Sequence, residues 1–84
     1  MTKWKVYILK CKDDSLYTGI TTDLEKRLKR HNDGKASKYT RPRRPVEIAY
    51  TENIINATSA RKREAEIKKL SRHDKLKMIQ KNPA

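Results

Sequence analysis

Residues 4–21 read WKVYILKCKDDSLYTGIT, and this stretch decides the fold. Its first part, WKVYILK, alternates between two faces, with Val6 and Ile8 on one and Tyr7 on the other, which predicts a strand with one well-buried face. A polar KDDS turn follows. The LYTGIT segment after it is rich in β-branched and aromatic residues and predicts a second strand. Two strands joined by a short polar turn predict an antiparallel hairpin.

A helix is expected directly after this hairpin. Thr22 and Glu25 have the spacing of a capping box, and Leu24 and Leu28 form an apolar i,i+4 pair. Gly34 is a typical stop signal. The sequence therefore predicts a helix near residues 23–32.

The second half of the chain predicts one more strand and two helices. Residues 46–51 alternate again, which is typical of a strand. A second helix is expected to begin after Asn56 or Ser59 and to run to about Leu70, and a short third helix follows a capping pattern at Ser71. The order β-β-α-β-α-α predicts an α+β fold. The sequence pattern leaves open whether the second and third strands are parallel or one is inserted between others.

Composition limits the kind of protein this can be. Its 84 residues make one domain, residues 1–84. Lys and Arg number 22 against 10 Asp and Glu, a net charge of +12, which favours a polyanionic partner. Nucleic acid is the first candidate; an anionic membrane is weaker, because no segment pairs a long apolar face with a basic one. Cys11 is the single cysteine, and no signal peptide or membrane span is recognisable, so we expect a soluble, cytoplasmic protein.

Glu64 is the most informative single residue in the second helix. On a helical wheel it lies within the apolar stripe formed by Ala57, Ala60 and Ile67, whereas Glu66 lies on the opposite face. A carboxylate on such a stripe is costly unless it is paired or bound to a cation. Two interpretations stay open: an ion pair with a nearby Lys or Arg, or a Mg²⁺ ligand, since Mg²⁺ often takes one or two carboxylates plus waters and phosphate oxygens.

Arg27 and His31 are i,i+4 neighbours on the first helix. They flank the leucine stripe, so we expect them at the border between core and solvent. Arg suits bidentate contact with phosphate, and His can move a proton or orient water. A plain structural role, with an Arg stem covering apolar surface, is the alternative.

Tyr7 and Tyr17 are candidate general bases in the two hairpin strands. A tyrosine serves as a base only if nearby cations lower its pKa, which is normally about 10, and this chain is rich in cations. The two can share one site only if they lie on the same sheet face, which requires an odd-length loop or a bulge. Gly19 inside a strand indicates a bulge or a close approach by another group.

The loop at residues 34–45 is dense in positive charge, and phosphate contact there is about as plausible as simple solvation. Its candidate nucleic-acid-binding residues are Lys35, Lys38, Arg41, Arg43 and Arg44.

Taken in order, these motifs resemble the GIY-YIG endonuclease superfamily, and above all its small stand-alone bacterial members of the UPF0213 type. The matching segments are Val6-Tyr7, Tyr17-Thr18-Gly19, Arg27-x-x-x-His31-Asn32 and Ala60-x-x-x-Glu64-x-x-Ile67-Lys68. The match covers nearly the whole chain, from about residue 4 to residue 72. Lys5 stands where the first motif has glycine and Thr18 where the second has isoleucine, and neither change removes a catalytic group.

This resemblance implies a three-stranded antiparallel sheet flanked by helices, and cleavage of DNA by direct attack of water with Mg²⁺ or Mn²⁺. By the same resemblance, Tyr7 or Tyr17 would be the general base, Arg27 would bind the phosphate, His31 would support it, and Glu64 would hold the metal.

We therefore expect a metal-dependent DNA endonuclease or nuclease-like repair protein that acts as a monomer. Branched DNA, damaged duplex, single strands and RNA all stay open as its substrate. One rival is a nucleic-acid-binding module that keeps the scaffold without the activity. Another is a small basic protein of the ribosome or nucleoid, in contact with an unidentified protein partner. The placement of Glu64 favours the enzyme, because a carboxylate there would repel phosphate unless it holds a cation.

Overall fold

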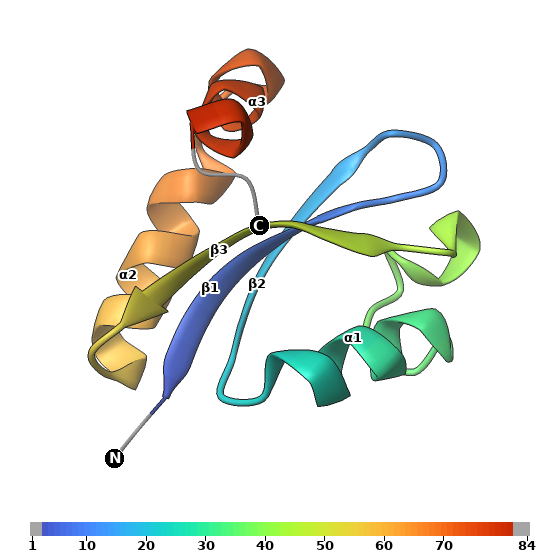
Figure 1. The fold of residues 1–84 in the computed structure, drawn as a ribbon, viewed down its shortest axis with the longest axis horizontal. Helices are drawn as coiled ribbons and strands as arrows, with labels where there is room; N and C mark the ends of the chain where they lie inside the picture. The colour runs from blue at the N-terminus through green and yellow to red at the C-terminus, as the bar shows by residue number, and fades with distance from the viewer. Residues whose placement is uncertain (1–2, 82–84) are drawn as a thin grey trace.

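The computed structural model describes residues 3–81, which form an α+β fold, as expected (Figure 1). The elements in chain order are β1 (Trp4–Lys10), β2 (Leu16–Thr21), α1 (Leu24–Asn32), a 3-10 turn at Arg41–Arg43, β3 (Glu47–Ile54), α2 (Ala57–Lys68) and α3 (Arg72–Lys81). The third strand is longer than its predicted 46–51, and α2 ends before Leu70. No helix within residues 3–81 has the length and apolar character needed to cross a membrane.

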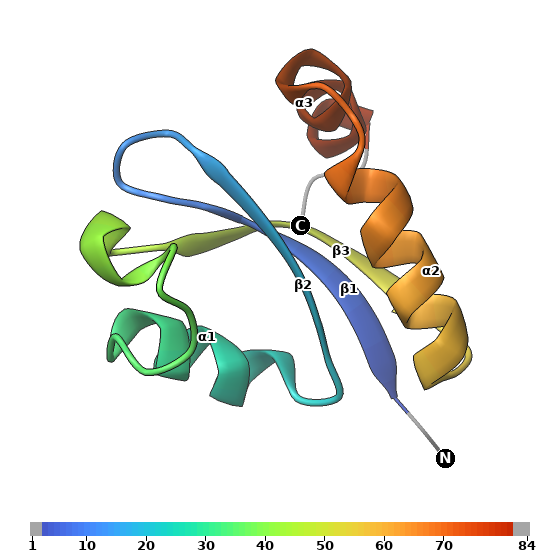
Figure 2. The same ribbon diagram turned by 180° about the vertical axis from the view of Figure 1, so that it is seen from behind.

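The sheet has the order β2-β1-β3, with β1 antiparallel to both neighbours. β2 and β3 therefore run in the same direction but do not pair, which settles the question that the sequence left open. The antiparallel three-stranded sheet implied by the resemblance is confirmed. The views from front and back show α1 on one side of the sheet and α2 with α3 on the other (Figures 1 and 2).

The central strand β1 is buried on both faces, so the prediction of a single well-buried face is wrong. Val6 and Ile8 are fully buried against Tyr50 and Ile67, on the side that carries α2. On the opposite side, Tyr7 and Leu9 form a second cluster. Leu24 and Leu28 of α1 pack against that second cluster. A strand covered by helices on both sides has no solvated face.

The hairpin register places the two motif tyrosines on one face. Leu9 pairs with Tyr17, and Tyr7 pairs with Gly19. Directly opposed residues share a face, as do residues two apart on one strand, so Tyr7 and Tyr17 lie on the same side of the sheet. The last paired residues are Lys10 and Leu16, which leaves an odd-length connection at residues 11–15. The geometric condition for a shared site is met.

Helix α1 begins one residue later than its capping pattern indicated. Asp23, not Thr22, is the N-cap, and its carboxylate accepts a hydrogen bond of 3.1 Å from the amide of Lys26. The predicted Thr22 capping box is therefore wrong, although the helix bounds are nearly right. Gly34 ends the helix as expected: it has φ of 78°, and its amide donates to the carbonyl of His31.

Helix α2 is fixed to the other side of the sheet by apolar and ionic contacts. Asn56 caps it, and Ala60 and Ile67 are fully buried. Arg63 donates two hydrogen bonds, of 2.8 and 3.1 Å, to the carboxylate of Glu52 on β3. These contacts set the rotation of α2, and with it the position of Glu64.

Candidate active site

Tyr7 lies across the backbone of Gly19, its partner on β2. A Cβ built on Gly19 would stand 2.5 Å from the Tyr7 hydroxyl oxygen and 2.6 Å from the adjoining ring carbon. A glycine is required here because the Tyr7 ring occupies the space of a side chain. The close approach expected at Gly19 is therefore made by the protein's own tyrosine, and the phenol is 2 % exposed.

The Tyr7 hydroxyl is bonded to His31, which α1 brings over the sheet. The hydroxyl oxygen lies 3.0 Å from His31 Nε2, and His31 Nδ1 lies 2.9 Å from the hydroxyl of Thr40. His31 is 1 % exposed and Thr40 is fully buried. The expectation that His31 lies at the border of core and solvent is wrong, because the loop after α1 folds over the imidazole and excludes water from it.

Tyr17 stands between His31 and the same loop. Its ring meets the imidazole edge-on, with centroids 5.2 Å apart, and stacks on Tyr39 at 5.9 Å. The guanidinium of Arg43 covers the Tyr39 ring at 4.0 Å from its centroid. Stacked and edge-on aromatic pairs stabilise one another beyond simple burial, and a guanidinium over a ring adds a cation–π attraction. Tyr39 therefore restricts the movement of Tyr17.

The loop that supplies Tyr39 and Thr40 is tied down at its ends and at the hairpin turn. Asn32 closes the ends: its amide accepts from the Val46 N–H at 2.7 Å and donates to the Val46 carbonyl at 3.1 Å. Arg43 bonds to the carboxylate of Asp13 at 3.1 Å and to the Tyr39 carbonyl at 2.7 Å. The β1–β2 turn, α1 and the loop thus form one framework around the two tyrosines.

The electrostatics keep Tyr7 and His31 uncharged. Burial raises the pKa of Tyr7 far above that of a free phenol, and the neighbouring Tyr17 and the carboxylate of Glu64 raise it further, while Arg27 opposes them. Burial also lowers the pKa of the His31 imidazole, and the charge of Arg27 adds to this effect. A neutral imidazole beside a neutral phenol can accept a proton from it. Arg27 itself is half-buried on α1, close enough for its charge to affect both groups.

Glu64 projects from α2 with its side chain 23 % exposed, whereas the side chain of Glu66 is 65 % exposed. The predicted difference between the core-side and solvent-side carboxylates is confirmed. Glu64 pairs with Lys68 at 3.3 Å, an ion pair between neighbouring turns that contributes little to stability. Within residues 3–81 no three His, Cys, Asp or Glu side chains form a cluster that could hold a metal ion.

A divalent cation in this site would therefore have Glu64 as its protein ligand. That arrangement suits Mg²⁺, which binds through one or two carboxylates, keeps several waters and takes substrate phosphate oxygens. The charge of Glu64 raises the pKa of Tyr7, although its effect is smaller than those of burial, Tyr17 and Arg27. A partly exposed carboxylate such as Glu64 is chemically suited to be the protein ligand of such a cation.

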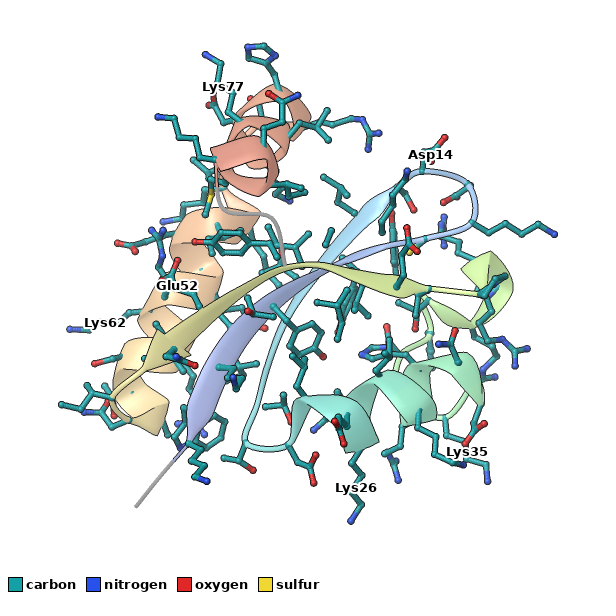
Figure 3. The ribbon with its side chains drawn as sticks, viewed as in Figure 1. Asp14, Lys26, Lys35, Glu52, Lys62 and Lys77 are labelled. Carbon is teal, nitrogen blue, oxygen red and sulfur yellow. The ribbon has the colours of Figure 1, made fainter. Side chains whose placement is uncertain are left out.

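The predicted basic loop divides into two groups. Arg41, Arg43 and Arg44 donate hydrogen bonds to backbone carbonyls of this loop and of the end of α1. Lys35 and Lys38 are exposed and, within the described residues, make no side-chain hydrogen bond or ion pair. Lys35 lies on the same outer side of the molecule as Lys26 of α1 (Figure 3). The arginines hold the loop together, and the lysines extend into solvent.

The structure thus brings both Tyr7 and Tyr17 into contact with His31. The charge of Arg27 acts on Tyr7 and His31, and that of Glu64 acts on Tyr7. Sequence reasoning missed Tyr39 and Thr40. A signal was available, because Tyr39 is aromatic and Thr40 is β-branched, whereas the rest of the loop is dense in cations. Side chains of these two kinds are expected in such a loop mainly where they pack against other residues.

Comparison with known proteins shows the family to which the chain belongs. A family model described as the GIY-YIG catalytic domain matches residues 3–77, most of the chain. The chain therefore belongs to the GIY-YIG family, a family of nuclease domains.

Its relatives are UPF0213 proteins. One from Staphylococcus haemolyticus is 55 % identical over 80 residues, covering 95 % of this chain and 98 % of the relative. One from Syntrophus aciditrophicus is 51 % identical, covering 99 % and 97 %. The solution NMR structure of a UPF0213 protein from Bacillus halodurans has a TM-score of 0.60 at 44 % identity, over 93 % of this chain and 83 % of that one.

Proposed function

We propose that the protein is a metal-dependent endonuclease that hydrolyses DNA phosphodiester bonds by direct attack of water. The observation that carries the proposal is the buried hydrogen bond between the Tyr7 hydroxyl and His31, because it gives a phenol of high pKa somewhere to send its proton. Family membership supports a nuclease-like role. The net charge of +12 supports a polyanionic substrate.

Tyr7 is the base in this proposal, and His31 is the proton acceptor behind it. The oxygen of water forms a bond to phosphorus while the bond from phosphorus to the leaving oxygen breaks. The leaving oxygen keeps the electron pair of that bond and takes a proton from solvent. The proton lost by water goes to the Tyr7 oxygen as the Tyr7 proton moves to His31 Nε2, so no phenolate has to accumulate. Removal of a proton by a positioned group is general base catalysis and contributes about 10²–10⁴-fold in rate.

Arg27 has the second role, as the guanidinium that binds the phosphate and offsets charge that develops in the transition state. Glu64 would hold the divalent cation, which when bound polarises the phosphate and stabilises the same charge. Tyr17, held between His31 and Tyr39, would bound the space in which the water and phosphate meet.

The exposed Lys35 and Lys38 would contact the DNA backbone, with the outer edges of Arg41, Arg43 and Arg44 beside them. The same proposal includes branched or damaged DNA as the substrate and DNA repair as the role. We also propose that the protein is a monomer in the cytoplasm, a reducing compartment that suits the free, buried Cys11.

Cleavage by the purified full chain tests the proposal. Single-stranded, duplex and branched DNA are incubated with Mg²⁺ or Mn²⁺ and with wild type, Glu64→Gln or Glu66→Gln. Glu66→Gln is the matched control, because it removes the same charge from an exposed site on the same helix. We expect cleavage by wild type and by Glu66→Gln, no cleavage by Glu64→Gln, and DNA binding by Glu64→Gln that is unchanged or tighter.

Melting curves of the two variants complete the experiment. If Glu64 serves only its ion pair with Lys68, a folded Glu64→Gln protein keeps metal-dependent cleavage, and the catalytic assignment fails. If wild type binds DNA but cleaves none of the substrates, the protein is a nucleic-acid-binding module on this scaffold. A purification control with a Tyr7→Phe protein identifies any contaminating nuclease.

A further inference from the structure

A chain of three hydrogen bonds runs through His31 and ends on the backbone. It links the Tyr7 hydroxyl to His31 Nε2 at 3.0 Å, His31 Nδ1 to the Thr40 hydroxyl at 2.9 Å, and the Thr40 hydroxyl to the carbonyl of Ser37 at 3.4 Å. Tyr7, His31 and Thr40 are each at most 2 % exposed. His31 and Thr40 are therefore closed to water, and the attacking water has to meet this chain of bonds at Tyr7.

The last bond of this chain is long for a hydroxyl donor, and it points to one direction for the bonds before it. The Ser37 carbonyl can only accept, so the Thr40 hydroxyl donates to it. The Thr40 oxygen then accepts from His31, which puts the single N–H of the neutral imidazole on Nδ1. His31 Nε2 is left with a lone pair, so the Tyr7 hydroxyl donates to it.

We propose that Thr40 is a positioning residue that holds His31 in the Nδ1–H tautomer and so keeps Tyr7 ready to act as the base. This inference rests on the proposed nuclease function and deepens it. The tautomer of a histidine is set by the hydrogen bond that its other ring nitrogen makes. Here that bond is to a neutral hydroxyl, with no carboxylate bonded to the imidazole among residues 3–81.

The opposite tautomer of His31 would prevent the proton transfer from water through Tyr7 to His31. With the N–H on Nε2, His31 would donate to the Tyr7 oxygen, and the Tyr7 proton would have to point elsewhere, toward the incoming water. Tyr7 could then neither take the water's proton nor pass its own to His31. Where a catalytic histidine loses the group that fixes its tautomer, kcat falls by up to about 10⁴. A neutral hydroxyl holds the tautomer less firmly than a carboxylate, so we expect a loss of at least about tenfold.

Ring-nitrogen NMR of the ¹⁵N-labelled full chain measures the tautomer directly. The chain has two histidines, and a His73→Gln protein assigns the resonances. We expect Nδ1–H for His31 in wild type. Thr40→Val keeps the shape and removes the hydroxyl, so we expect a mixture of tautomers or Nε2–H, with kcat at least about tenfold lower and KM unchanged. Thr40→Ser restores the hydroxyl, and we expect it to restore both readouts.

Thr18→Val is the matched control. Thr18 is also buried, at 3 % exposure, and its hydroxyl is the one buried side-chain polar atom within residues 3–81 that has no hydrogen-bond partner. It pairs with Ile8 on the sheet face away from Tyr7. We expect this variant to fold at least as well as wild type and to leave the His31 tautomer and cleavage unchanged.

Several results would overturn the inference. If wild-type His31 carries its proton on Nε2, the inference fails without any variant. The test therefore stays decisive even if Thr40→Val does not fold. Unchanged Nδ1–H in a folded Thr40→Val protein, or full kcat in that protein, does the same. If wild type cleaves no DNA, the proposed nuclease function fails, and the NMR comparison of wild type, Thr40→Ser and Thr40→Val still decides whether Thr40 sets the tautomer.

Discussion

Gly19→Ala is the smallest change that should damage both the fold and the site. The new Cβ would stand 2.5 Å from the Tyr7 hydroxyl oxygen, where ordinary contacts are 3.4–4 Å, so the phenol has to move by about 1 Å. Tyr7 has little room to do so, because it is 2 % exposed and bonded to His31 at 3.0 Å. A displacement of that size breaks the bond to His31.

The expected loss of stability combines two effects. Overpacking of a close-packed site costs about 1–3 kcal/mol, and the lost hydrogen bond adds about 1 kcal/mol. A total of about 2–4 kcal/mol corresponds to a Tm lower by at least about 8 °C in a domain of this size. Cleavage should fall together with stability, because the Tyr7 hydroxyl no longer reaches His31.

Gly34→Ala serves as the control, because it has the same chemistry at a different place. Its φ of 78° makes alanine unfavourable by about 1 kcal/mol, and its Cβ would meet the guanidinium at the far end of the Arg44 side chain, at 2.9 Å. Thermal melting and single-turnover cleavage, both below the lower Tm, compare the two proteins. The reasoning is refuted if Gly19→Ala melts no lower than Gly34→Ala, or if it cleaves as fast as wild type.

Three further predictions concern the loop and its histidine. Arg43→Ala removes the guanidinium that covers Tyr39, so the free energy of unfolding should fall by about 1–2 kcal/mol in thermal melts, and cleavage should fall as well. An unchanged Tm would show that Arg43 does not hold Tyr39 in place. The double variant Lys35→Ala, Lys38→Ala should keep its Tm and bind DNA more weakly. The slope of log K against log salt concentration should become shallower by about 2 if both lysines contact phosphate. An unchanged slope would show that the DNA backbone does not contact these lysines. Because the pKa of His31 is lowered by folding, the unfolded chain takes up a proton at a higher pH than the folded one, and stability should fall as pH drops below about 6.5. Urea melts between pH 7 and 5 should show this fall in the free energy of unfolding in wild type and not in His31→Gln.

Much of the fold follows from local patterns in the sequence. The periodicity of α2 is sufficient to separate Glu64 from Glu66, because a helix face is fixed by residue spacing alone. The capping pattern places the start of α1 one residue too early, since Thr22 and Asp23 are both good caps and the pattern does not choose between them. The Thr21 hydroxyl, which accepts a hydrogen bond from the Asp23 amide, favours the later start.

The burial of His31 could not be read from α1. It depends on a loop closing over the imidazole, and that closure comes from contacts between residues far apart in sequence, such as Asn32 with Val46 and Arg43 with Asp13. Likewise, the shared face of the two tyrosines depends on whether the polar turn has an even or odd number of residues. Composition predicts that a turn exists, but its length is set by how the strands pair.

The double burial of β1 also bears on how active and inactive members of such a family could be told apart. Tyr7 belongs to the core between the sheet and α1, so a relative without nuclease activity would still need a large ring at this position to remain folded. Its retention therefore says little about whether a given relative cuts DNA. Glu64 is different, because its one ion pair lies at the surface and could be lost almost without effect on folding. If Glu64 holds the metal as proposed, loss of the carboxylate at position 64 beside a retained tyrosine would identify a relative that has lost nuclease activity.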